Sequence, residues 1–191
     1  MDQMKKKIVA FAVPYMEGHH DAGHYYRVES FGRQLWQREG GDWIVIFTAL
    51  RLHDIGRKIN VRKHPKIGAD IARGFLPQIG FPADKLEAVV RSILLHDKHG
   101  GQRTIEEKIV YDADRLDCFT YSGLIRCFLE ARGKRGVEVT LPERVQCAEK
   151  YLKLAYKSFN TKTAQEIASE YKREFMFGFL SRIKGEQRFP V

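Results

Sequence analysis

Cysteine is scarce in this chain of 191 residues, which has only Cys118, Cys127 and Cys147 and no C-x-x-C pair. An odd and small number of cysteines excludes a scaffold held together by disulfide bonds. Free thiols are typical of proteins in reducing compartments, so we expect three reduced cysteines and a cytoplasmic location.

Long apolar runs are also missing, whereas a membrane-spanning helix needs about 20 apolar residues in a row. The longest runs are Ile8–Tyr15, which Pro14 interrupts, and Trp43–Leu50. The start of the chain, Lys5–Lys7 followed by Ile8–Val13, has a faint similarity to a signal peptide, but no A-x-A cleavage pattern follows it. We therefore expect neither a membrane span nor a membrane partner.

Acidic residues are outnumbered, since 33 Lys and Arg against 24 Asp and Glu give a net charge of +9. More than half of this surplus lies in Arg51–Arg73, which holds seven basic and two acidic residues. Such a surplus is typical of proteins that bind nucleic acid or other phosphate-bearing molecules. Apolar residues make up 43% of the chain, which excludes a disordered protein and suffices for one folded domain.

Apolar residues recur at helical spacing, as in the series Val28, Phe31 and Leu35, so we expect one all-α domain, a helical bundle over residues 1–191. Residue types that start helices stand at Asp21, Asp42, Pro65, Pro82, Thr104 and Thr140. The expected helix ends are Gly40-Gly41, Ile55, Pro77, Gly100-Gly101 and Arg132-Gly133. The last helices carry the apolar series Ile167, Tyr171, Phe175 and Phe179. A strand is the alternative only for Trp43–Phe47, where a helix is favoured because the run continues to Leu52 without turn residues.

All seven histidines lie in the first 99 residues, and some of them stand near carboxylates on expected helices. His24, the adjacent pair His53-Asp54 and Asp114 offer imidazole and carboxylate ligands, which suit a divalent metal ion. Adjacent helix residues point about 100° apart, so His53 and Asp54 can share an ion only at the edge between them. The core of a helical bundle is a common place for such a site, although core histidines and capping aspartates explain the residues equally well.

Three short motifs surround these residues. Asp21–Val28 contains H-x-x-R-V, Leu52–Gly56 contains H-D-I-G, and Asp112–Asp117 is D-A-D-R-L-D. Together, in the order H…HD…D, they resemble the HD-domain phosphohydrolases over about residues 18–125. Within that superfamily the chain is most similar to small stand-alone bacterial and archaeal hydrolases.

The resemblance implies an HD-type helical bundle, on whose motif-bearing part the C-terminal helices at about residues 140–185 pack. The metal ligands that it implies are His24, His53, Asp54 and Asp114. Asp112 and Asp117 are alternatives to Asp114, since Asp117 shares its helical face at i+3. His20 also lies near the first ligand, although the motif favours His24.

His64 and His96 resemble the extra ligand positions of binuclear relatives, the HD-GYP cyclic-dinucleotide phosphodiesterases. The chain lacks the G-Y-P signature and has Lys98–Gly101 after Asp97. We therefore expect His64 and His96 to contact a substrate phosphate or to protonate the leaving group, rather than to hold a second metal.

A basic run follows the His-Asp pair. It fits an electrostatic collar for a polyanionic substrate, and a solvated loop explains it equally well. The residues that we expect to bind substrate are Arg57, Lys58, Lys66 and His99. Arg27 and Arg115 adjoin the ligand positions, and we expect them to anchor buried carboxylates.

The resemblance therefore predicts a metal-dependent phosphohydrolase that cleaves a phosphoester or phosphoanhydride bond of a nucleotide with metal-activated water, which Asp54 orients or deprotonates. The expected ion is Mn, Mg, Fe, Co or Ni, with Zn as an alternative. One alternative function is a non-enzymatic basic module that binds nucleic acid. Another is an HD-type nuclease or cyclic-nucleotide phosphodiesterase, for which nucleic acid is a substrate.

Overall fold

A computed structural model describes residues 2–16, 22–130, 139–172 and 178–186. Within these ranges every regular element is helical, which confirms the all-α prediction. The α-helices are α1 (Asp2–Ala12), α2 (Ala22–Glu39), α3 (Trp43–Leu52), α4 (His64–Phe75), α5 (Ala83–Leu95), α6 (Ile105–Asp117), α7 (Tyr121–Glu130), α8 (Leu141–Ser158), α9 (Lys162–Lys172) and α10 (Leu180–Glu186). Two short 3₁₀ helices are η1 (Val13–Tyr15) and η2 (Leu76–Ile79).

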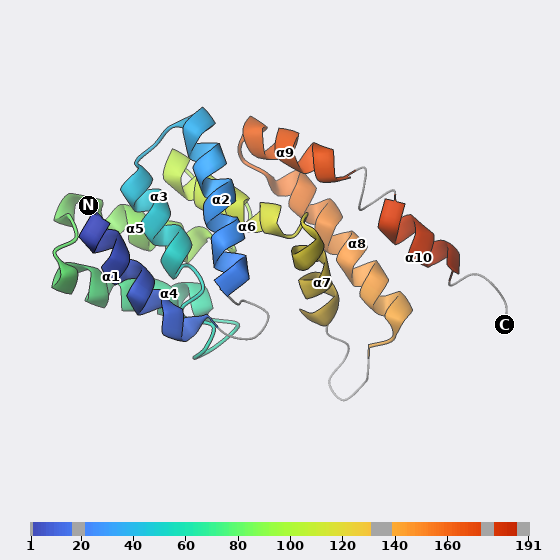
Figure 1. Cartoon of the computed structure of the whole chain (residues 1–191), viewed down its shortest axis with the longest axis horizontal. Helices are drawn as coiled ribbons and strands as arrows, with labels where there is room; N and C mark the ends of the chain where they lie inside the picture. Colours follow the sequence, from blue (N-terminus) through green and yellow to red (C-terminus); the bar gives the residue numbers. More distant parts are fainter. Residues whose placement is uncertain (1, 17–21, 131–138, 173–177, 187–191) are drawn as a thin grey trace.

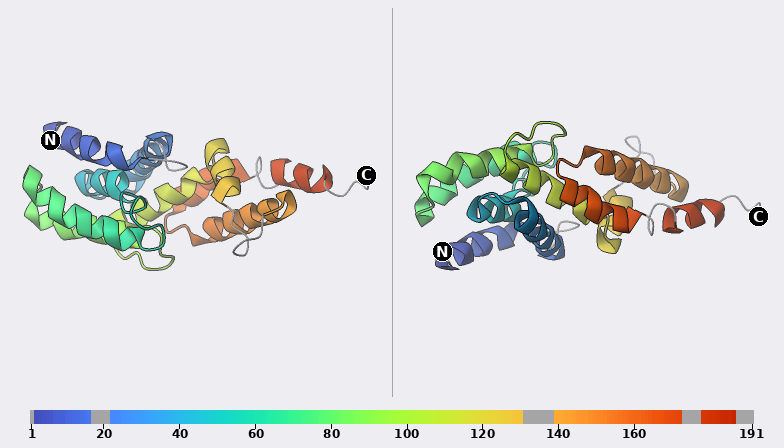
Figure 2. Two further views of the ribbon diagram at one scale, coloured as in Figure 1. Left: turned by 90° about the horizontal axis from the view of Figure 1, so that it is seen from below. Right: turned by 90° about the horizontal axis from the view of Figure 1, so that it is seen from above.

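The helices form an elongated arrangement (Figure 1). Helices α1, α3, α4 and α5 gather at one end, α7, α8 and α10 lie at the other, and α2 and α6 lie between them. Two further views keep the same order along the long axis (Figure 2). Helix α2 packs against α3, α6 and α9, and α6 also packs against α3 and α5. The three helices that carry or precede the predicted metal ligands are therefore neighbours.

Helix α3 is the central buried helix, because nearly all of its side chains are apolar, and it confirms the helix prediction over the strand. Asp42 caps it by accepting hydrogen bonds from backbone N–H groups of the first turn. The predicted end at Ile55 is wrong, since α3 ends at Leu52 and the chain then turns. Gly56 permits this turn, because a Cβ at that position would lie 2.3 Å from the carbonyl oxygen of His64.

Helix α6 begins at the predicted capping box, in which the hydroxyl of Thr104 accepts the N–H of Glu107 and the carboxylate of Glu107 accepts the N–H of Thr104. It ends at Asp117, much earlier than predicted. The chain turns there because Gly123 packs against the helix end, where a Cβ would lie 1.8 Å from the carbonyl oxygen of Asp117. Thr120 then accepts the N–H of Gly123 in the first turn of α7.

Other predicted boundaries differ in detail. Helix α1 was not predicted, although Ile8 and Ala12 form its buried face. Helix α5 ends at Leu95, before the glycine pair, and η2 occupies part of the predicted loop. The predicted positions that lie outside the described residues are Asp21, His20, Arg132-Gly133 and Phe175. Among the described helices, none combines the length and the apolar character that crossing a membrane requires.

Candidate metal centre

Side chains from two helices and one turn meet at a single point in the molecule. His24 lies on α2, His53 follows the end of α3, Asp54 lies in the turn after it, and Asp114 lies on α6. His24 Nε2 lies 3.2 Å from His53 Nε2, and Asp114 Oδ1 lies 3.6 and 3.7 Å from these two nitrogens. Asp54 Oδ2 lies 3.5 Å from His53 Nε2 and 3.8 Å from His24 Nε2. The structure thus brings the four predicted ligands together.

Asp54 joins this group to a second pair of histidines. Its Oδ1 atom lies 3.1 Å from His64 Nε2 and 3.4 Å from His96 Nε2, while the two imidazoles lie 3.0 Å apart. His64 starts α4 and His96 follows the end of α5. All three side chains are buried. Both histidines therefore lie at the same centre as the predicted ligands. They contact Oδ1 of Asp54, whereas His24 and His53 lie near Oδ2.

The hydrogen bonds of the Nδ1 atoms show how these imidazoles are oriented toward a cation. The Nδ1 atoms of His53, His64 and His96 lie 2.6–2.8 Å from backbone carbonyl oxygens three residues earlier. A carbonyl only accepts, so each Nδ1 carries a proton and each ring directs its Nε2 at the centre. His24 Nδ1 likewise lies 3.0 Å from Asp117 Oδ2. Converging lone pairs and carboxylate oxygens, held by such second partners, are the chemistry of a metal site.

The electrostatic surroundings shift the pKa values of His53 and His96 in opposite directions. Burial, together with the neighbouring histidines, lowers the pKa of His53 to about 4 despite the two aspartates, so this imidazole is neutral at neutral pH. Burial raises the pKa of Asp114, but His53, Arg115 and His24 outweigh it and lower that pKa below its usual value. Burial lowers the pKa of His96, yet its hydrogen bond to Asp54 raises it overall.

The two alternative ligands on α6 face other partners. The carboxylate of Asp112 accepts hydrogen bonds from the backbone N–H groups of Asn160 and Thr161, where α9 begins. Asp117 Oδ2 lies 3.0 Å from His24 Nδ1, and the carboxylate pairs with Arg27 and with Arg126. Of the three aspartates on this helix, Asp114 is the one that faces the Nε2 atoms of His24 and His53.

The basic run after the His-Asp pair does not form the expected collar. Arg57 lines the pocket at the centre. The other three residues expected to bind substrate do not line this pocket. Lys58 donates to the carbonyl oxygen of Pro14, and Lys66 is exposed and pairs with Asp70. His99 is also exposed. Arg27 and Arg115 pair with aspartates, as expected.

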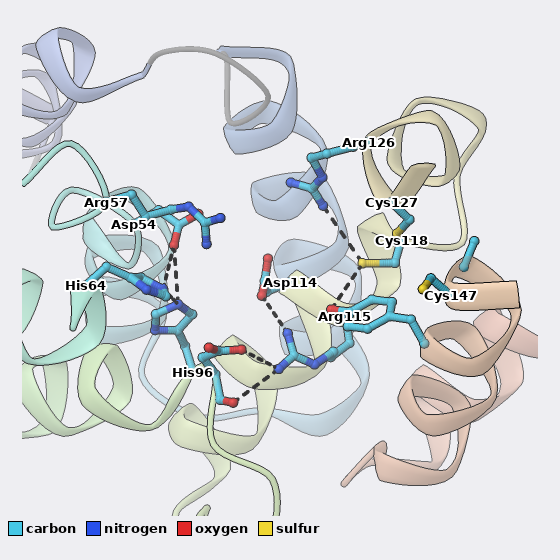
Figure 3. Close-up of a pocket in the computed structure, with 13 residues that line it drawn as sticks. Asp54, Arg57, His64, His96, Asp114, Arg115, Cys118, Arg126, Cys127 and Cys147 are labelled. Carbon is cyan, nitrogen blue, oxygen red and sulfur yellow. Dashed lines mark hydrogen bonds and ion pairs between the residues drawn. The ribbon is translucent and has the colours of Figure 1, made fainter. Parts of the chain in front are cut away.

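A pocket of about 390 Å³ opens above the centre (Figure 3). Asp54, His64 and His96 lie at one side of it, and Cys118, Cys127 and Cys147 lie at the other. Three arginines bring positive charge to the pocket: Arg57 lies on the side of Asp54, Arg126 lies on the side of the cysteines, and Arg115 lies between them. Arg126 and the three thiols were not predicted as site residues, because no sequence motif marks them. Arg126 and Cys127 lie on α7, Cys147 lies on α8, and Cys118 follows the end of α6.

Comparisons with known proteins agree with the fold and with the motifs. The sequence profile of the HD domain family matches residues 21–118, more than half of the chain. The Bacillus subtilis protein YpgQ is 27% identical over 175 residues, which cover 86% of this chain and 83% of YpgQ.

Solved structures are similar over nearly the whole length of the chain. The crystal structure of B. subtilis YpgQ in complex with ADP is 25% identical, with a TM-score of 0.71 over 98% of this chain and 97% of that one. The structure of a predicted HD superfamily hydrolase from an uncultured Thermotogales bacterium is 26% identical, with a TM-score of 0.66 over 98% of this chain and 92% of that one.

Proposed function

The chain belongs to the HD domain family, and we propose that it is a metal-dependent phosphohydrolase that cleaves a phosphoester or phosphoanhydride bond of a nucleotide. The observation that carries this proposal is the position of Asp54. One of its oxygens faces His24 and His53, while the other faces His64 and His96, at the end of a pocket lined by three arginines.

The residues that would hold the ion are His24, His53, Asp54 and Asp114. Nitrogen and oxygen donors of this kind suit Mn, Mg, Fe, Co or Ni, with Zn as an alternative. A divalent ion at this position supplies a Lewis acid for a phosphoryl oxygen and lowers the pKa of water to near neutrality.

The remaining chemistry belongs to the side chains of the pocket. Asp54 orients the attacking water or accepts its proton, since its two oxygens lie between the ligand group and the second histidine pair. His64 and His96 contact the phosphate or give a proton to the leaving oxygen. Arg57 and Arg115 offset the negative charge that grows on the phosphoryl oxygens as the bond breaks.

A nucleotide is the proposed substrate for two reasons. The pocket of about 390 Å³ lies within the range of roughly 300–1,000 Å³ that is usual for small-molecule sites. In addition, the similar protein YpgQ was crystallised with ADP. A cytoplasmic nucleotide pool would supply such a molecule, in keeping with the expected location.

A hydrolysis screen of metal-stripped protein tests the proposal. It covers nucleotides, cyclic nucleotides and single-stranded DNA, with each divalent ion added back in turn. We expect release of phosphate or pyrophosphate from nucleotides only after metal is restored, and none from His53→Ala. The matched control is Asp70→Ala, because Asp70 is exposed and pairs only with neighbouring basic residues. Tight DNA binding that chelation leaves unchanged, without any hydrolysis, would instead support the nucleic-acid-binding module.

A further inference from the structure

The pocket extends beyond the family match. Four of its lining residues, which we call the thiol wall, come from α7 and α8: Cys127, Cys147, Ala148 and Tyr151. The HD domain profile ends at residue 118, so the wall is built by the helices that follow the shared region. We propose that the thiol wall binds the base of the nucleotide and thereby selects the substrate; this inference rests on the proposed function.

The chemistry of the wall suits a planar, uncharged ring. It consists of two thiols, a methyl group and a phenol, and carries no ionised side chain. Sulfur atoms make favourable contacts with aromatic rings, and a tyrosine ring offers a face on which a base can stack. Cys147 is exposed and the Tyr151 side chain is 39% exposed, so both are accessible to a ligand. The Tyr151 hydroxyl also accepts a hydrogen bond from the buried thiol of Cys118, at 3.7 Å, which fixes its position.

The order of groups across the pocket matches the order of groups in a nucleotide. Carboxylates line the metal end of the pocket. Asp54 and Asp114 belong to the candidate metal centre, and Asp97 is linked to Asp114 because both pair with Arg115. Next come the guanidinium groups of Arg115 and Arg126, and Arg126 Nη2 lies 3.9 Å from Cys118 Sγ, beside the wall (Figure 3). Guanidinium groups bind phosphate oxygens, so phosphates at the metal end direct the base toward the wall.

Chemical protection of Cys147 tests this placement in the unmodified protein. The metal-loaded protein is treated with iodoacetamide, and the rate of Cys147 alkylation is followed by mass spectrometry. The two probes are α,β-methylene-ADP and methylenediphosphonate, which share the same uncleavable phosphate mimic but differ in the nucleoside. We expect α,β-methylene-ADP, at about ten times its Kd, to slow alkylation about tenfold, because only the unliganded fraction reacts. Methylenediphosphonate at the same saturation should leave the rate unchanged.

A pair of variants on α8 supplies the second measurement. Cys147→Trp fills the pocket at the wall, whereas Gln146→Trp adds the same side chain at an adjacent exposed position that does not line the pocket. We expect Cys147→Trp to weaken α,β-methylene-ADP binding about tenfold or more, because the loss of one stacked base typically weakens binding by that factor. The affinity for methylenediphosphonate should be unchanged. Gln146→Trp should bind both probes like the wild type.

The outcomes separate this inference from the proposed function. Binding of both probes without protection of Cys147, or an equal loss of both affinities in Cys147→Trp, overturns the thiol wall and leaves the phosphohydrolase proposal standing. Failure of the wild-type protein to bind either probe overturns both. Binding of α,β-methylene-ADP with selective protection supports the wall whether or not a particular nucleotide is hydrolysed.

Discussion

Asp117 lies behind the metal centre and is expected to control it without contacting the ion. It is fully buried, and its Oδ2 atom lies 3.0 Å from His24 Nδ1 and 2.7 Å from Arg126 Nη2. Arg27 pairs with the other oxygen. Together with Arg126 Nη1, which lies 2.6 Å from the same nitrogen, the carboxylate fixes the orientation of the His24 ring, so that Nε2 is directed at the centre. The variant Asp117→Asn preserves the shape of the side chain and removes this charge.

The expected loss can be estimated from these contacts. Removal of such a second partner typically weakens metal binding by about 10- to 100-fold, or about 1.4–2.8 kcal/mol. Folding stability should fall by about 3–5 kcal/mol, because the buried guanidinium of Arg126 loses its carboxylate. Burial raises the pKa of Asp117, but His24, Arg27 and Arg126 lower it below 3.8. Its contribution to stability is therefore complete above about pH 4 and is lost as the pH falls further, so wild type and variant should converge in acid.

Chelator competition measures the metal affinity, and chemical unfolding with and without metal measures the stability. The matched control is Asp112→Asn, a second fully buried aspartate on α6 that is bonded to Asn160 and Thr161 instead. It should lose stability with little change in metal affinity. Wild-type metal affinity in Asp117→Asn, or an equal loss in both variants, would refute the reasoning.

Two further predictions use paired positions in and near the turn after α3. Arg57→Ala should lower kcat/KM for a nucleotide about tenfold or more in steady-state assays, because it removes a guanidinium from the pocket. The control Lys66→Ala, at an exposed position, should change kcat/KM by no more than about twofold. Gly56→Ala should lower the free energy of unfolding by about 1–3 kcal/mol, since its Cβ would clash with the backbone of His64, and should lower activity by displacing that histidine. Gly74→Ala has open space and should stabilise α4 by about 0.5 kcal/mol in denaturant titrations; a neutral Gly56→Ala would contradict the close packing.

The sequence predicted the helical class and the four ligand positions, because capping residues, apolar spacing and three ordered motifs are all local patterns. It could not separate Asp114 from Asp112 and Asp117, since helical spacing does not show which face meets α2. That choice is set by partners distant in the chain, such as Asn160 for Asp112 and His24 for Asp117.

The charge pattern was misleading for a related reason. The basic residues of Arg51–Arg73 looked like a collar, but Lys66 pairs with Asp70 and Arg51 is buried against Glu29, so part of this charge is neutralised away from the pocket. Arg126 reaches the pocket from α7 through packing alone, and no local motif marks it. Helix periodicity identifies buried faces, whereas the contents of a pocket depend on which helices meet.

The most direct test of the central claim is nucleotide hydrolysis by metal-stripped protein to which Mn²⁺ is returned, measured for the wild type and for Asp54→Ala. The position of Asp54 between the two histidine pairs predicts metal-restored phosphate or pyrophosphate release by the wild type and none by the variant. Full turnover by metal-free Asp54→Ala protein would contradict the account.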